Sequence, residues 1–195
     1  MSTEARLAEI IRASPRMMTV MRAIRGERLP QWRIFAGAVY QTAWNGLTGR
    51  DPDHGVRDYD VIYFDPDPSW DAEDAVIRRV AAALPDDLRG AVEVRNQSRV
   101  HLWFPQKFGR PYAPLTHADD ALSRAVATVH ALGVRLEDDD TISVAAPLGM
   151  DDLFALRFRA GPGGFDPAVV AAKAGAARAR WPEVTIDATP WTPAP

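Results

Sequence analysis

The chain has 195 residues, of which 47% are hydrophobic and 25% charged, with a net charge of −3. These values are typical of a globular protein and exclude disorder as the default state. The acidic balance argues against general nucleic-acid binding, which needs a basic excess to neutralise phosphates. There is no cysteine, which excludes disulfides, thiolate nucleophiles and cysteine-ligated metals. This composition fits a reducing compartment, so the cytoplasm is the expected location.

No segment of the chain approaches the roughly 20 consecutive apolar residues that a membrane-spanning helix needs. The first residues, MSTEARLAEIIRASPRMM, contain early acids and no long apolar run. They do not resemble a signal peptide. We therefore expect no membrane association.

Helical signals dominate the first quarter of the chain. Residues 3–26 carry apolar side chains at helical spacing, and Pro15 divides them into two predicted helices, the second ending at Gly26. A further helix is predicted over residues 38–47. The segment GRDPDHGV, residues 49–56, is rich in turn-forming residues and predicts a loop.

Strand signals dominate the middle of the chain. DYDVIYFD, residues 58–65, is β-branched and aromatic in its second half and is closed by Pro66, so it predicts a strand. Ser69, followed by acids, predicts an N-cap and a helix through Leu84. Further strands are predicted over residues 92–97 and 100–104.

The last third mixes both kinds of element. An amphipathic helix is predicted over residues 116–132, capped by Thr116 and ended by Gly133. The next predicted elements are a hairpin (134–136 and 142–145), a helix (166–181) and a tail (TPWTPAP, 189–195). This order predicts an α+β fold with a mixed β-sheet flanked by helices. We expect one domain over 1–195, with N-terminal helices in 1–30, the core in 31–105 and C-terminal elements in 106–195.

Two acids in the strand DYDVIYFD carry the strongest chemical signal. Side chains alternate along a strand, so Asp58 and Asp60 point to the same face, about 6–7 Å apart along the backbone. Two partly buried carboxylates on one face repel each other. A divalent cation removes that repulsion, and oxygen ligands suit Mg²⁺ or Mn²⁺.

A third acid follows in EVRNQSRVHLWF. Glu93 shares its strand face with Arg95 and Gln97, and it completes a three-carboxylate cluster if this strand pairs beside the first. Such clusters hold the metals of two-metal phosphoryl transfer. The alternative is that these acids are solvated strand ends, which are common, and that Arg95 is a plain ion-pair partner of Glu93.

Four ordered segments, GAVYQTAWNGLTG, DYDVIYFD, EVRNQSRVHLWF and PLGMDDLFALRFR, together resemble the bacterial nucleotidyltransferase-like proteins that are distantly related to the DNA polymerase β superfamily. The resemblance covers residues 32–159. It implies a polymerase β-like nucleotidyltransferase fold. In that superfamily, a glycine-containing turn opens a helix that holds the triphosphate, and a D-x-D strand and a later acid hold the metals.

Carried onto this chain, the resemblance places Gly37 and Ala38 in the turn, and Asp58, Asp60 and Glu93 at the metal and catalytic site. The chain departs from the common pattern because Ala38 offers no hydroxyl to a phosphate and because the interval to Asp58 is longer. Backbone N–H groups at a helix start still bind phosphate without a side chain.

Three polar residues are candidate nucleotide ligands. Gln41 and Asn45 lie one turn apart on the predicted helix after Gly37, where the alternative is a polar helix face. Arg95 offers bidentate geometry to a triphosphate. The hypothesis is thus a metal-dependent enzyme that transfers a nucleotidyl group from a nucleoside triphosphate to an unknown acceptor. Its rival is a catalytically degenerate module of the same fold that only binds a nucleotide or a partner.

Overall fold

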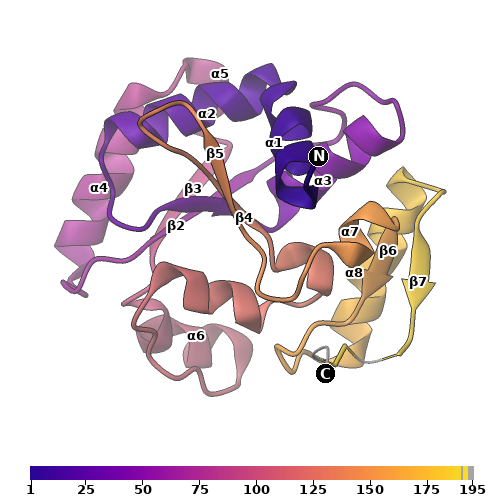
Figure 1. Cartoon of the computed structure of the whole chain (residues 1–195). Helices are drawn as coiled ribbons and strands as arrows, with labels where there is room; N and C mark the ends of the chain where they lie inside the picture. Colours follow the sequence, from indigo (N-terminus) through magenta and orange to yellow (C-terminus); the bar gives the residue numbers. More distant parts are fainter. Residues whose placement is uncertain (190, 193–195) are drawn as a thin grey trace.

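The computed structural model describes residues 1–189 and 191–192, so the predicted tail at 189–195 lies partly outside the described residues. Its strands form a five-stranded sheet with the order β3-β2-β1-β4-β5 and a two-stranded sheet, β6-β7 (Figure 1). The strands are β1 (Arg33–Phe35), β2 (Tyr59–Tyr63), β3 (Val92–Asn96), β4 (Gly133–Leu136), β5 (Ile142–Ala145), β6 (Arg157–Arg159) and β7 (Thr185–Asp187).

The helices lie between and around these strands. They are α1 (Thr3–Arg12), α2 (Pro15–Gly26), α3 (Gly37–Leu47), α4 (Trp70–Ala83), α5 (Asp86–Arg89), α6 (Val100–Phe108), α7 (Asp151–Phe154) and α8 (Pro167–Arg180), with 3₁₀ segments η1 (Ala118–Arg124) and η2 (Thr128–His130). Ser14 caps α2 and Ser69 caps α4, each by accepting a backbone N–H in the first turn. No helix in the described part of the chain is long and apolar enough to cross a bilayer.

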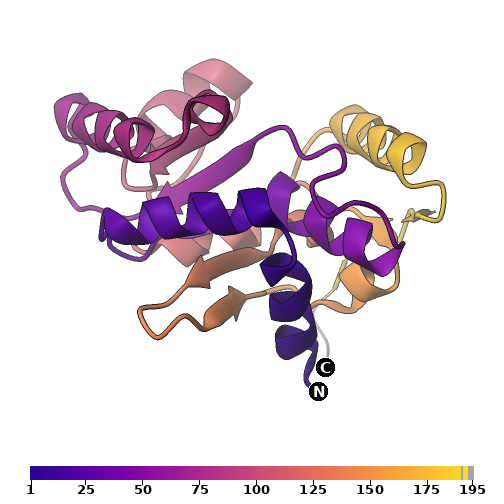
Figure 2. The ribbon, with the colours of Figure 1, turned by 90° about the horizontal axis from the view of Figure 1, so that it is seen from above.

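The predicted mixed sheet flanked by helices is confirmed. β1 pairs antiparallel with both β2 and β4, whereas β2 and β3 run parallel. The parallel pair is joined by a crossover through α4 and α5, as a parallel connection requires. Figure 2 shows the β4–β5 hairpin and α4 at opposite edges of this arrangement.

The two faces of the five-stranded sheet pack differently. Tyr59, Val61 and Tyr63 point into the main hydrophobic core, which α2, α3 and α4 cover. Ile62 points to the opposite face, where it packs in a smaller cluster with residues of the 115–122 segment. In Figure 1, α6 lies on this second face, across the sheet from α2. The second face also carries the predicted acids.

The predicted strand at 100–104 is wrong, because these residues form the start of α6. β-branched and aromatic residues in VHLWF favour a strand by composition. The spacing of Val100, Phe104 and Phe108 is helical instead, because successive members are four positions apart. Val100 and Phe104 are buried, so packing of this helical stripe decides the conformation.

The predicted helix at 116–132 is also wrong, because the chain there forms only η1 and η2 with extended residues between them. His117 caps η1, not Thr116. Ala127 forms a β-bridge with Ala160, and this tertiary pairing replaces helical hydrogen bonds. Gly133 opens β4 rather than ending a helix, and a Cβ there would lie 2.7 Å from the Arg33 side chain.

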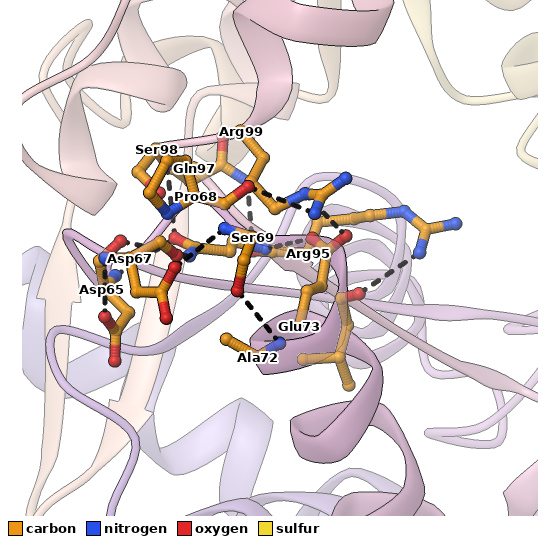
Figure 3. A network of polar contacts seen from close by, with 12 residues as sticks. Asp65, Asp67, Pro68, Ser69, Ala72, Glu73, Arg95, Gln97, Ser98 and Arg99 are labelled. Atoms are coloured by element: carbon orange, nitrogen blue, oxygen red, sulfur yellow. Dashed lines mark hydrogen bonds and ion pairs between the residues drawn. The ribbon is translucent and has the colours of Figure 1, made fainter.

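A buried polar network joins α4 to the turn between β3 and α6 (Figure 3). Glu73 is 2% exposed. Its Oε1 accepts the Asn96 N–H at 2.7 Å, and its Oε2 lies 3.2 Å from Arg99 Nε. The Asn96 side chain in turn donates to the carbonyls of Asp65 and Asp67. This network therefore fixes the ends of β2 and β3 relative to α4 and α6.

We predict that Glu73→Ala lowers the free energy of unfolding by about 3–5 kcal/mol, because it leaves the Arg99 charge buried without its partner. Glu73→Gln keeps an acceptor for the Asn96 N–H and should lose less. Urea denaturation measures both. The control is Glu183→Ala, which removes an exposed ion pair with Arg50 and should change stability far less. Equal losses for Glu73→Ala and the control would contradict this role.

Candidate active site

Strand register brings two of the predicted acids side by side. Asp60 of β2 pairs with Glu93 of β3 on one side and with Phe35 of β1 on the other. These three residues form a row across the sheet, on the face that α6 covers. The three-carboxylate hypothesis required these two strands to pair side by side, and they do so, in parallel orientation.

Asp58 lies just before β2 in the chain and, in space, next to Gly37 at the start of α3. A Cβ built on Gly37 would lie 4.0 Å from Asp58 Oδ1 and 3.3 Å from Gln41 Nε2. Asp58 is exposed, and Asp60 is partly buried. Asp58 thus lies beside the start of α3, whereas Asp60 and Glu93 lie next to each other on the face of the sheet.

Asp60 is the most perturbed acid of the group. Burial first, and then the neighbouring charges of Asp58 and Glu93, raise the pKa of Asp60 to about 6. Lys173 and Arg95 act in the opposite direction and lower it. The three carboxylates are therefore close enough to repel one another at Asp60, which is the situation that a bound cation relieves.

Glu93 is half exposed and forms an ion pair with Arg95, with Arg95 Nη2 2.7 Å from Glu93 Oε1. Among the described residues, no three acidic or histidine side chains are arranged as a preformed ligand shell. The donor chemistry nevertheless fits Mg²⁺, which takes one or two protein carboxylates and completes its shell with water and substrate phosphates. Asp58 and Asp60 are the residues that would supply that pair, and Glu93 would join them on leaving Arg95.

The chain enters α3 through a strained residue. Ala36 has φ 54° and ψ −117°, a conformation that residues with side chains rarely adopt. It turns β1 directly into α3, so that the helix begins next to Asp58. The first-turn N–H groups of a helix lack internal acceptors, and within the described chain no side chain caps α3. The start of α3 at Gly37 and Ala38 is therefore available to an anion.

The two predicted amide ligands have different surroundings. Gln41 lies behind Gly37, and its Oε1 accepts a hydrogen bond from Arg180 at 3.2 Å. Asn45 is fully buried, donates to the carbonyls of Pro52 and His54, and accepts from the Trp181 indole at 2.9 Å. The Asn45 amide thus holds the 49–56 loop against Trp181, and the structure does not bring it to the acids.

Helix α8 brings basic residues that the sequence did not single out. Lys173 lines the same cavity as Asp60, and Arg180 holds both Gln41 and the carbonyl of Gly55. The sequence signal was only a predicted helix with basic residues late in it. Nothing in the spacing places this helix opposite β2, because more than 100 residues separate them.

His130 is a second residue that sequence reasoning missed. It is 9% exposed, packs edge-on against Tyr40 and Phe158, and lines the cavity beside Lys173. Burial, with the Lys173 charge, lowers the pKa of His130 to about 3, so the imidazole is neutral. Its Nδ1 is buried and has no hydrogen-bond partner among the described residues.

A cavity of about 280 Å³ opens from the acids along the α6 face of the sheet. Asp60, Glu93 and Arg95 line it from the strands, and the other walls come from α6, the 121–130 segment, Phe165 and α8. The site therefore combines acids, a helix start and a concave, largely apolar space, which is a typical arrangement for a small-molecule site.

The model of a nucleotidyltransferase family matches residues 22–186, and the chain belongs to this family. The match spans the five-stranded sheet, the acids and all of α8. It places the chain in the class of proteins that the resemblance of its four segments predicted.

One solved structure has the same fold, with a TM-score of 0.74 over 96% of this chain and 97% of the other. It is an NMR structure described as a CCA-adding enzyme head domain, and the two sequences are 24% identical. A likeness at this identity supports the polymerase β-like nucleotidyltransferase fold. Among curated proteins, no significant match is found.

We predict that Asp60→Asn stabilises the protein at pH 7.5 by about 1–3 kcal/mol. The raised pKa of Asp60 means that the native state holds a proton that the unfolded state releases between about pH 4 and pH 6. The free energy of unfolding therefore falls as pH rises through this window, and the uncharged amide avoids the loss.

Urea denaturation at pH 4 and pH 7.5 measures this effect, with Asp86→Asn as the control, since its side chain is 91% exposed. The stabilisation by Asp60→Asn should shrink strongly at pH 4. A difference of the same size at both pH values would mean that the charge of Asp60 is not its cause.

Proposed function

We propose that this chain is a metal-dependent nucleotidyltransferase that moves a nucleotidyl group from a nucleoside triphosphate to a hydroxyl acceptor. The observation that carries the proposal is the row that Asp60 and Glu93 form on neighbouring strands, with Asp58 between this row and the start of α3. Membership of the nucleotidyltransferase family supports the reaction class. Mg²⁺ or Mn²⁺ is the expected cofactor, and the cytoplasm remains the expected location.

Each acid has a role in this proposal. Asp58 and Asp60 hold the metal, and Glu93 completes the set and accepts the proton of the acceptor hydroxyl. When bound, the metal supplies charge stabilisation at the transferring phosphorus. The raised pKa of Asp60 supports this assignment, because burial and then the charges of Asp58 and Glu93 disfavour its ionised form, which a bound cation would stabilise.

The phosphates have their own binding region. The free N–H groups at Gly37 and Ala38, together with the positive end of the α3 dipole, bind anionic oxygens. Lys173 comes from α8, and we assign it to the same phosphates, with Arg180 and Gln41 behind it. Arg95 is assigned to the nucleotide once Glu93 turns to the metal, since its guanidinium also lines the cavity.

The second candidate function is a degenerate module that binds a nucleotide or a partner without turnover. The specific observation in its favour is the ion pair between Glu93 and Arg95, which occupies the third acid. Ala38 also lacks the hydroxyl that the superfamily turn usually offers. Binding alone does not distinguish the two functions, whereas release of pyrophosphate does.

We expect Mn²⁺ and a nucleoside triphosphate together to raise the melting temperature. Ligand at 100 times its Kd stabilises the native state by about 2.7 kcal/mol, which is roughly 5–10 °C for a chain of this size. Differential scanning fluorimetry with each of the four triphosphates measures the shift. Asp58→Asn and Asp60→Asn should abolish it, and Asp86→Asn should retain it.

Two results would contradict parts of this proposal. No shift with any triphosphate and metal would remove the nucleotide site itself. A shift that depends on Asp60, without pyrophosphate release under any condition, would favour the degenerate module.

We further predict that Lys173→Met weakens triphosphate binding roughly 10- to 100-fold, because a charge-assisted contact contributes about 1.5–3 kcal/mol. Calorimetric titration in the presence of Mn²⁺ measures this affinity. Lys107, on α6, is the other lysine of the chain, so Lys107→Met is a matched control. Equal effects of the two substitutions would show that Lys173 contributes only general charge.

A further inference from the structure

Aromatic side chains form the wall of the cavity away from α3. Trp103, Phe104 and Phe108 come from α6, Tyr112 from the segment after it, and Phe165 from the segment before α8. Phe108 is 49% exposed at the rim, whereas Phe104 is buried. Two of the acids, Asp60 and Glu93, line the same cavity. The cavity thus has two acids on the strands and an aromatic wall on α6 and its neighbours, and we call the part along this wall the aromatic chamber.

This wall is held in place by contacts within the chain. Arg110 lies 3.9 Å over the Phe165 ring and 5.3 Å from the Phe104 ring centre, and it donates to the Gly163 carbonyl at 2.8 Å. The Phe104 ring lies 4.5 Å from both Phe108 and Tyr112. Because these rings are already ordered, a ligand loses little free energy in arranging them.

The segment before Phe165 packs closely against the backbone of residues 124–127. A Cβ on Gly161 would lie 2.6 Å from the Ala125 carbonyl oxygen, and one on Gly163 would lie 2.7 Å from the same atom. Only glycine permits this approach of two backbones. The contact therefore fixes the chain just before Phe165 against residues 124–127, and Phe165, Arg124, Ala125 and Val126 line the same cavity.

The positions of the three acids relative to α3 and the cavity indicate which substrate occupies the aromatic chamber. Asp58 lies next to the α3 start and does not line the cavity, whereas Asp60 and Glu93 do. In phosphoryl transfer the attacking and leaving oxygens lie roughly in line on opposite sides of the phosphorus. If the leaving pyrophosphate lies at α3, the attacking oxygen comes from the far side of the acids, which is the aromatic chamber.

We propose that the acceptor is a small molecule with a flat, apolar or aromatic body and one hydroxyl group, which the aromatic wall holds with its oxygen at Glu93. This assignment rests on the proposed function and specifies its acceptor. The hydroxyl oxygen forms a bond to the α-phosphorus, the bond from that phosphorus to the bridging oxygen breaks, and pyrophosphate leaves. The hydroxyl proton passes to the Glu93 carboxylate and then to solvent.

The size and chemistry of the chamber favour such an acceptor over a polymer. Its volume of about 280 Å³ is near the lower end of ligand cavities, which span roughly 300–1,000 Å³. Aromatic rings stack on a flat body and discriminate against a flexible polyol, which gains nothing from them. The net charge of −3 disfavours a polynucleotide.

Binding is tested first, without metal or nucleotide, so that its outcome is independent of the proposed function. The probes are 6-hydroxyquinoline and quinoline, which share a flat body and differ in the hydroxyl. Calorimetric titration should detect both. Val126→Phe, which fills the chamber, should weaken both at least tenfold. Val169→Phe, at a position 42% exposed on α8, is the matched control and should leave binding unchanged.

Val126→Phe enlarges a partly buried residue, so Phe108→Glu provides a second variant at the exposed rim. It introduces a charge into the aromatic wall without changing the core. It should weaken binding of both probes in the same direction. Failure of both probes to bind, or binding that neither variant weakens, would overturn the assignment of the chamber.

Transfer is tested next, with Mn²⁺ and each triphosphate, by pyrophosphate release. At equal concentrations, 6-hydroxyquinoline should stimulate release at least tenfold more than glycerol, and quinoline should inhibit without being modified. Stronger stimulation by an oligonucleotide with a free 3′-hydroxyl, or by a protein, would overturn the proposal. So would quinoline binding in competition with the triphosphate, which would place the nucleobase in the chamber.

The two proposals fail in distinguishable ways. If metal and triphosphate raise the melting temperature but the quinolines do not bind, the acceptor assignment is wrong and the nucleotide site stands. If the quinolines bind but no triphosphate does, the chamber serves another ligand and both the proposed function and its acceptor are wrong.

Discussion

Parallel pairing of β2 with β3 puts Asp60 beside Glu93 on one face of the sheet, and the electrostatics of the site follow from this register. The pKa of Asp60 is raised by its burial and then by repulsion from the carboxylates of Asp58 and Glu93. A shift of β3 by one residue relative to β2 would turn the Glu93 side chain toward the main core, so that Asp60 and Glu93 would no longer share a face. The Glu73 network, which bonds the Asn96 N–H at the end of β3, holds this register.

The remaining parts of the site are arranged around this row of acids. The strained turn at Ala36 delivers the start of α3 to Asp58, and α8 brings Lys173 to the opposite side. Negative groups on the strands thus face positive groups on two helices across a small space. Such an arrangement suits a substrate that carries both a metal ion and phosphates, because each partner meets the opposite charge.

The apolar side of the cavity adds a different constraint. Acids in water are stabilised by solvent, whereas acids at the end of an aromatic chamber are partly deprived of it, which strengthens each interaction made there. Arg110 and the glycine segment before α8 keep this chamber closed on one side. The same features that raise the pKa of Asp60 therefore also restrict what can reach it.

Local sequence patterns determined much of the fold. Pro15, Ser69 and the alternation in DYDVIYFD set the first two helices, the α4 cap and β2, because these signals act within a few residues. Alternation along the two predicted strands picked out Asp58, Asp60 and Glu93 as candidates, and the four ordered segments predicted the nucleotidyltransferase family. All of these inferences depend on residues that are close together in the chain, so their spacing can be read from the sequence itself.

Tertiary contacts decided the rest. Residues 100–104 became part of α6 because Val100 and Phe104 are buried at helical spacing, and residues 116–132 lost their predicted helix because Ala127 pairs with Ala160. Asn45, predicted on the same helix as Gln41, was turned to a buried indole, while Lys173 and His130 came to the cavity from distant segments. These outcomes depend on long-range packing, whose partners lie tens of residues away and leave no periodic mark in the sequence.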